Sequence, residues 1–162
     1  MDVTGTDRLG RGGRASNDEF EPTSATDIRH TVTLRQRGLR PTRQRVAMMR
    51  LLFDAGGRHV SAEDVRAAAR ASGDYLPPAT VYNSLRQFVE VGLLREVATI
   101  ETSCIFDTRT DPHHHFLVGE TGEMVDVALD EVTFARLPEP PEGMEIESCE
   151  VTIRLRRRSL VP

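Results

Sequence analysis

Helix start and stop signals between residues 42 and 92 constrain the fold of this 162-residue chain more than any other feature. Thr42 is a typical N-cap residue, and apolar side chains at helical spacing follow it up to the Gly56-Gly57 pair. Ser61 can cap a second helix, because the two acidic residues in the turn after it would complement the helix dipole. These signals predict two short helices, one directly after the other.

A third helix pattern opens at Pro77-Pro78 and ends before Gly92. Its apolar positions fall on one face of the helix: Val81, Leu85, Phe88 and Val89. Two short strand patterns come next, at residues 93–97 and 104–106. Three helices followed by a two-stranded wing are typical of a winged helix-turn-helix, in which the third helix would enter the major groove of DNA.

The polar face of that third helix carries side chains suited to DNA. Tyr82, Asn83 and Gln87 can reach base edges, while Thr80 and Arg86 can bind phosphates. An ordinary amphipathic helix with a solvated polar face is the alternative interpretation.

Charge divides the chain in a way that favours DNA binding. Residues 28–95 contain 12 arginines and 5 acidic residues, whereas residues 96–162 contain 6 arginines and 14 acidic residues. A positive field attracts phosphates, and the release of counterions adds affinity. Helix order, the basic segment and the wing together therefore favour a DNA-binding unit.

The acidic second half has the pattern of a small α/β unit. Residues 114–118 and 124–127 predict a hairpin, residues 130–136 a short helix, and residues 149–156 an alternating strand. Such a unit has little core of its own, so we expect it to pair with a second copy and form a homodimer.

The N-terminal segment, residues 1–27, is polar and without periodicity, which predicts a disordered arm. A short helix is expected at residues 34–37, ended by Gly38, and His30 is expected at the surface. No run of 18 apolar residues and no signal-peptide pattern is present, so we expect a cytoplasmic protein without a membrane partner.

The predicted fold class is α+β, with an N-terminal winged helix-turn-helix followed by a small α/β dimerisation domain. The expected divisions are a disordered arm (1–27), a winged-helix DNA-binding domain (28–107), a hinge (108–112), a dimerisation and sensing domain (113–156) and a tail (157–162). The two cysteines, Cys104 and Cys149, form no C-x-x-C pair. The sequence leaves open a single disulfide between them.

Three adjacent histidines stand in the stretch D-P-H-H-H-F-L-V, residues 111–118. A solvated turn is the simplest interpretation of such a run, and a metal site is the alternative. His113 and His115 are two positions apart, so on a strand they would point the same way, with His114 on the opposite face.

Several ordered motifs resemble the ferric uptake regulator superfamily over about residues 34–156. They are G-L-R-P-T-R-Q-R (38–45), R-H-V-S-A-E-D (58–64), A-T-V-Y-N-S-L-R-Q-F (79–88), V-G-L-L (91–94) and the histidine run with its flanks. Within that superfamily the chain is most similar to the iron response regulator branch of alpha-proteobacteria, through T-V-Y-N, the three adjacent histidines, L-P-E-P-P-E-G-M-E-I and R-L-R-R-R. The resemblance implies a dimeric regulator that binds operator DNA and reports iron status through haem.

The resemblance also implies a site between the two domains for a divalent metal ion, Mn(II), Fe(II) or Zn(II). Its ligands would be His59, Asp107, His113, His115 and Asp126. Haem would use the run itself, His113, His114 and His115, and would compete with the divalent ion. The C-x-x-C structural zinc motif of the family is replaced by Val118 and Thr121, so we expect no structural zinc.

For DNA, the resemblance implies that Arg40 binds the minor groove and that Tyr82 contacts a base. Asn83 stands where typical members have Arg, which affects operator identity. Together with their basic and polar neighbours, the expected DNA-binding residues are Arg40, Arg43, Arg45, Thr80, Tyr82, Asn83, Arg86 and Gln87.

We therefore predict an iron- and haem-responsive transcriptional regulator, mainly a repressor of haem synthesis and iron metabolism genes, that releases DNA when haem binds. The alternatives are a regulator activated by Fe(II) or Mn(II), a haem-binding or transfer module, and a metallohydrolase with zinc at the histidines. The last two leave the basic segment and the third helix unexplained, so no enzyme activity is expected.

Overall fold

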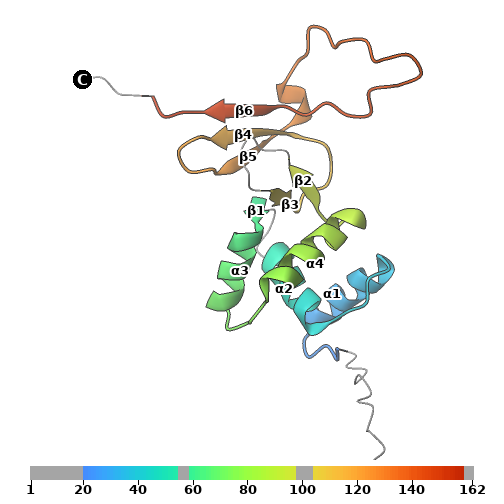
Figure 1. Ribbon diagram of the computed structural model, residues 1–162, viewed down its shortest axis with the longest axis vertical. Coiled ribbons are helices and arrows are strands. Elements are labelled where there is room, and N and C mark those ends of the chain that lie inside the picture. Colours follow the sequence, from blue (N-terminus) through green and yellow to red (C-terminus); the bar gives the residue numbers. More distant parts are fainter. Residues whose placement is uncertain (1–19, 55–58, 98–103, 159–162) are drawn as a thin grey trace, which may run out of the picture.

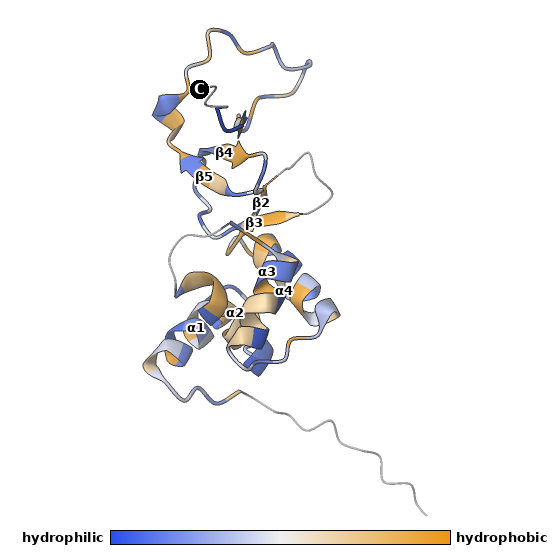
Figure 2. Cartoon of the chain, turned by 90° about the vertical axis from the view of Figure 1, so that its left-hand side faces the viewer, coloured by the Kyte–Doolittle hydropathy of each residue, from blue (hydrophilic) through white to orange (hydrophobic). Residues whose placement is uncertain are grey.

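The chain is stacked in three levels in the computed structural model, which describes residues 20–54, 59–97 and 104–158. Four helices lie at one end, a small sheet lies in the middle, and a second sheet lies at the other end (Figure 1). Figure 2 shows the same levels from the side, with the loop that leads to the last strand projecting away from the helices. Any site between the two sheets therefore joins the two halves of the sequence.

The helices are α1 (Ala25–Gln36), α2 (Arg43–Phe53), α3 (Ala62–Ala71) and α4 (Pro78–Glu90). The side chains of Ser24, Thr42 and Ser61 cap the first three, and Ser61 forms a full capping box with Asp64. α4 begins with Pro at its first position and is followed by Gly92 at φ 68°, a conformation that glycine adopts without strain. The predicted caps and breaks at Thr42, Ser61, Pro78 and Gly92 match these ends.

The main core lies among the helices and includes the predicted face of α4. Val81, Leu85 and Phe88 are fully buried, as are Leu34 of α1 and Leu52 of α2. Burial of large apolar side chains contributes about 1.5–3 kcal/mol each, so this cluster stabilises the helical half.

The first sheet contains β1 (His59–Ser61), β2 (Arg95–Val97) and β3 (Ile105–Asp107), all antiparallel, in the order β1-β3-β2. Asp107 on the central strand is opposite His59 on one neighbour and opposite Arg95 on the other. The predicted two-stranded wing is thus joined by a third strand from the link between α2 and α3.

The second sheet contains β4 (His114–Val118), β5 (Met124–Val127) and β6 (Thr152–Leu155), in the order β5-β4-β6. β4 and β5 form the predicted antiparallel hairpin, and β6 pairs parallel with β4. A small apolar cluster of Val97, Leu117 and Met124, with Ile105 against it, joins the two sheets. The C-terminal half has little core, as its composition indicated.

Several predicted details are wrong. α1 begins at Ala25, inside the arm predicted for residues 1–27, and is much longer than the helix predicted at 34–37. The sequence did not predict the first turns of α1, because their buried contact is ionic. Asp27 is 1% exposed and accepts a hydrogen bond of 3.1 Å from Arg50. His30, expected at the surface, is buried and lies 3.0 Å from Asp54.

The C-terminal half also differs. Instead of a helix at residues 130–136 there is only the 3-10 turn η1 (Leu129–Glu131), after which Val132 is extended. The predicted strand 149–156 is limited to the four residues of β6, all exposed in the single chain. Residues 1–19 of the predicted arm, the Gly56-Gly57 break and the last four residues of the tail lie outside the described part of the chain.

Candidate functional site

Five side chains from both halves of the chain converge where the two sheets meet. His59 comes from β1, Asp107 from β3 and Asp126 from β5. His115 lies on β4, and His113 directly precedes that strand. One nitrogen or carboxylate oxygen of each lies within 4.8 Å of all the others. The structure thus brings together all five residues named for the divalent metal ion.

The backbone register explains this convergence. His59 and Asp107 are directly opposite on β1 and β3, and His115 and Asp126 are directly opposite on β4 and β5. His113 precedes β4 and lies two positions from His115, so both rings lie on one side, with centroids 4.5 Å apart.

The shortest distances in the cluster join an imidazole to a carboxylate. His113 Nε2 is 3.0 Å from Asp107 Oδ2 and 3.3 Å from Asp126 Oδ1. His59 Nε2 is 3.1 Å from Asp126 Oδ1, and His115 Nε2 is 3.7 Å from Asp107 Oδ2. Asp107, His113 and His115 are at most 1% exposed.

Four of these buried atoms have no hydrogen-bond partner among the described residues: His59 Nε2, Asp107 Oδ2, His113 Nε2 and His115 Nε2. A buried polar atom without a partner costs about 1–3 kcal/mol, so native proteins rarely bury several together. A cation at their centre would satisfy all four at once. Three imidazoles and two carboxylates suit divalent ions such as Fe(II), Mn(II) and Zn(II).

The contacts of His113 and the burial of His115 suit both side chains to binding a metal ion. His113 Nδ1 donates to the carbonyl oxygen of Asp111 over 2.8 Å, which fixes the ring with Nε2 directed at the cluster. Burial lowers the pKa of His115, and positive charge at His113, His59 and Arg95 lowers it further. The charged form of His115 is therefore disfavoured, and the neutral form is the one that binds metal.

Two arginines that the motifs did not single out lie behind the carboxylates. Arg95 Nε is 3.9 Å from Asp107 Oδ2, and its terminal nitrogen contacts Glu150, which precedes β6. Arg109 contacts Asp126 and Asp111. Neither residue was singled out, because the contact of Arg95 with Asp107 depends on the pairing of β2 with β3, and that of Arg109 with Asp126 depends on how the two sheets are placed.

His114, the middle residue of the run, points away from the cluster. It is 1% exposed, its Nδ1 accepts a hydrogen bond of 3.2 Å from the backbone of Val151, and its ring lies 6.0 Å from that of Phe134. Of the three residues named for haem, His113 and His115 thus face the cluster and His114 faces the opposite side, and none is exposed to solvent.

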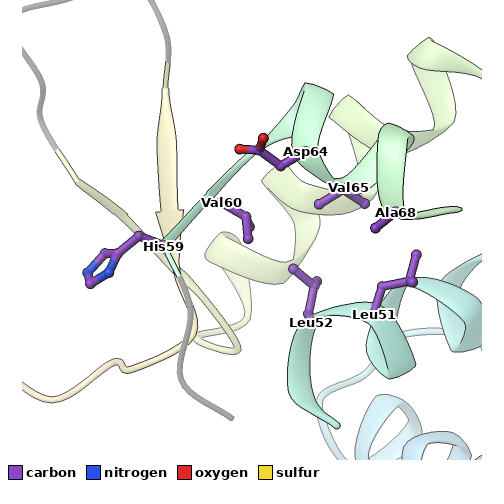
Figure 3. Close-up of a pocket in the computed structure, with 7 residues that line it drawn as sticks. All are labelled: Leu51, Leu52, His59, Val60, Asp64, Val65 and Ala68. Carbon is purple, nitrogen blue, oxygen red and sulfur yellow. The ribbon is translucent and has the colours of Figure 1, made fainter. Parts of the chain in front are cut away.

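A pocket of about 270 Å³ lies on the other side of β1. Figure 3 shows Val60 pointing toward Leu52 and the helices, while the His59 ring points the opposite way. Among the five clustered residues, only His59 lines this pocket. The alternation of β1 therefore places Val60 in the core and His59 in the cluster.

The residues named for DNA lie on α2, α4 and the segment before α2. Tyr82, 53% exposed, is joined at the surface of α4 by Asn83 and Arg86, whereas Thr80 and Gln87 are half-buried. Arg45 donates to Gln87 Oε1 over 2.6 Å and to the Arg40 carbonyl over 2.7 Å. These bonds fix the N-terminal end of α2 against α4 and hold the set on adjoining elements.

Neither cysteine belongs to the cluster. Cys104 is exposed, and both it and Cys149 are free, so the disulfide left open by the sequence is absent between these two described residues. No helix in the described ranges combines the length and apolarity needed to cross a bilayer.

Comparison with known proteins places these features in context. Residues 36–154 match the model of the Ferric uptake regulator family. The chain is 35% identical over 103 residues to the peroxide-responsive repressor PerR of Staphylococcus epidermidis, covering 62% of this chain and 68% of that protein. It is 34% identical over 94 residues to the PerR of Staphylococcus aureus strain Mu50, covering 58% and 63%. The matched part thus spans about two thirds of these relatives.

Solved structures of ferric uptake regulators are similar to this chain in fold. The ferric uptake regulator of Pseudomonas aeruginosa with manganese is similar with a TM-score of 0.62 and 27% identity, covering 80% of this chain and 98% of that one. The ferric uptake regulator of Vibrio cholerae has the same TM-score at 18% identity, covering 78% and 98%, and supports the fold alone.

Proposed function

The chain belongs to the ferric uptake regulator family, and on this basis we propose that it is a repressor whose affinity for operator DNA depends on a divalent metal ion bound between its two domains. Members of this family are transcription regulators that bind operator DNA as dimers, and they are not enzymes. The metallohydrolase alternative is therefore set aside.

One observation carries the proposal: the ligand atoms come from both halves of the chain. His59 and Asp107 belong to the sheet attached to the helices, whereas His113, His115 and Asp126 belong to the second sheet or its approach. A bound ion would tie these parts together and fix the helices relative to the dimerisation domain. Binding energy at the site would thus favour one arrangement for DNA.

We assign α4 as the recognition helix of a winged helix-turn-helix, with β2 and β3 as strands of the wing. α4 follows α3 through a short connection, and its apolar face is buried while Tyr82, Asn83 and Arg86 are exposed. This exposed surface supports base contacts, and Arg40 before α2 and Arg43 at its start add positive charge nearby.

Dimerisation through the second sheet is supported by apolar side chains left uncovered in the single chain. Val125 on β5 and Ile153 and Leu155 on β6 are 36–46% exposed. A second copy would cover them and place two recognition helices on one operator, inside the cytoplasm where the DNA lies.

Operator affinity measured with and without metal tests the proposal. Purified protein loaded with Mn(II), Fe(II) or Zn(II) should bind a cognate operator more tightly than chelator-treated protein, while affinity for unrelated DNA should change little. The double variant His113→Ala/His115→Ala should bind the operator equally in both conditions. Equal operator affinity of the wild type with and without metal would contradict the proposal.

The chemical signal at the site is a second proposal. The resemblance to iron response regulators predicts release of DNA by haem, for which imidazole is an ordinary axial ligand. Because His113 and His115 are buried in the cluster, haem would have to displace the ion and separate the sheets. Haem and hydrogen peroxide, the latter suggested by the names of the PerR relatives, should each be titrated into the operator complex. Only the signal that the site reports should release DNA.

A further inference from the structure

Arg109 is hydrogen-bonded to both carboxylates of the cluster. Its backbone N–H donates to Asp107 Oδ1 over 2.8 Å, and its guanidinium donates to Asp126 Oδ2 over 3.2 Å. In each carboxylate the second oxygen is the one that faces the imidazoles: Asp107 Oδ2 is 3.0 Å and Asp126 Oδ1 is 3.3 Å from His113 Nε2. One residue therefore holds the outer oxygen of both acidic side chains.

The guanidinium is itself held in place by Asp111. Arg109 Nε lies 3.1 and 3.0 Å from the two carboxylate oxygens of Asp111, and a terminal nitrogen lies 2.7 Å from one of them. This pairing holds the pKa of Arg109 above its ordinary value and that of Asp111 below its ordinary value. The Asp111 carbonyl also accepts the hydrogen bond of His113 Nδ1. The same short segment thus orients His113 and Arg109.

Orientation matters most for Asp126. Asp107 is 1% exposed, but the side chain of Asp126 is 33% exposed and has room to rotate. Without the guanidinium, Asp126 would be free to turn toward solvent or to offer both oxygens to an ion. With Oδ2 bound to Arg109, only Oδ1 is directed inward.

We propose that Arg109 is a positioning residue of the metal site, which presents both aspartates through a single inward oxygen each. This inference rests on the metal site of the proposed function. Residues that orient metal ligands typically change metal affinity by about 10–100-fold when they are removed. The opposing possibility is that the positive charge of Arg109 weakens the binding of a cation, in which case its removal would tighten binding.

Metal binding by four dimeric full-length proteins tests the inference: the wild type, Arg109→Gln, Arg109→Lys and Arg136→Gln. Arg109→Lys retains the charge but lacks the planar fork that reaches Asp111 and Asp126 together. Arg136→Gln is a matched control, because it removes an exposed arginine that belongs to neither the cluster nor its contacts. The readouts are the Kd for Mn(II) and the visible absorption spectrum of the Co(II)-loaded protein, with unfolding midpoints of the metal-free proteins as a check on folding.

We expect Arg109→Gln to raise the Kd about 10–100-fold and to alter the Co(II) spectrum, Arg109→Lys to raise it in the same direction, and Arg136→Gln to leave both readouts unchanged. In an Asp126→Asn background, Arg109→Gln should add little, because its effect passes through Asp126. An unchanged or lower Kd in Arg109→Gln would overturn the inference while leaving the metal site intact. A wild type that binds neither ion would overturn both.

Discussion

His59 on β1 and Asp126 on β5 belong to different sheets, yet the Nε2 atom of His59 lies 3.1 Å from Oδ1 of Asp126. His59 is attached to the helical half through β1 and the Ser61 cap of α3, whereas Asp126 belongs to the hairpin of the second half. A metal ion bound by both residues would couple the position of the helices to the occupancy of the proposed site.

Substituting His59 should therefore separate metal binding from DNA binding. His59→Ala leaves four of the five candidate ligands in place, but it removes the imidazole on β1. Coupling between two sites is typically about 5–150-fold in affinity, and we expect the metal-dependent gain in operator affinity to disappear in this variant. Operator titrations with Mn(II) and with chelator check it. A wild-type gain in His59→Ala would show that β1 plays no part in the coupling.

Tyr82 should contribute to operator recognition and not to folding. Its side chain is 53% exposed on the polar face of α4, where it covers no core. Tyr82→Ala should weaken operator binding by about 1–3 kcal/mol, the range of a good base contact, with little change for unrelated DNA. Binding isotherms on both DNAs check this, with thermal unfolding as the control. Equal losses on both DNAs would instead make Tyr82 a contact to the backbone of the duplex.

Arg86 should act through phosphates. It is exposed on α4, and affinity depends less on salt when a protein binds fewer phosphates. Arg86→Gln should reduce the slope of log affinity against log salt by about one and weaken operator and unrelated DNA alike. Arg70→Gln is the matched control, since Arg70 is likewise exposed but lies near Glu63 on α3. A weakening confined to the operator would make Arg86 a base contact.

Local signals in the sequence were sufficient to predict the helices and strands around the site. Ser61 and Pro78 mark helix starts because caps and proline act through the nearest backbone groups, and the β4–β5 hairpin follows from alternation and a Gly turn. The five clustered residues were named through family resemblance, and composition or spacing alone would not have joined His59 to Asp126. Their meeting depends on the pairing of β1 with β3 and on the placement of the two sheets.

Contacts between distant segments account for what the sequence did not predict. Apart from Leu34, the buried positions of α1 are polar, and Asp27 and His30 pair there with Arg50 and Asp54, which leaves no apolar period to detect. Arg109 interacts with Asp126, 17 positions further along the chain, only because the segment between β3 and β4 lies beside β5. Such contacts are set by tertiary structure, so a local pattern does not contain them.

The stability of the metal-free protein should fall as the pH is lowered through 6.5, because of His115. Burial lowers the pKa of this side chain below its ordinary value of 6.5, and the charges of His113, His59 and Arg95 act in the same direction. At a pH between the lowered pKa and 6.5, the unfolded chain binds a proton at His115 that the folded chain does not. The free energy of unfolding therefore rises with pH in this window, by at most about 1.4 kcal/mol per pH unit for one group. Urea unfolding of chelator-treated protein at pH 7.5, 6.5 and 5.5 measures the slope, and His115→Gln should make it shallower. The same slope in wild type and variant would assign the loss of stability to other groups.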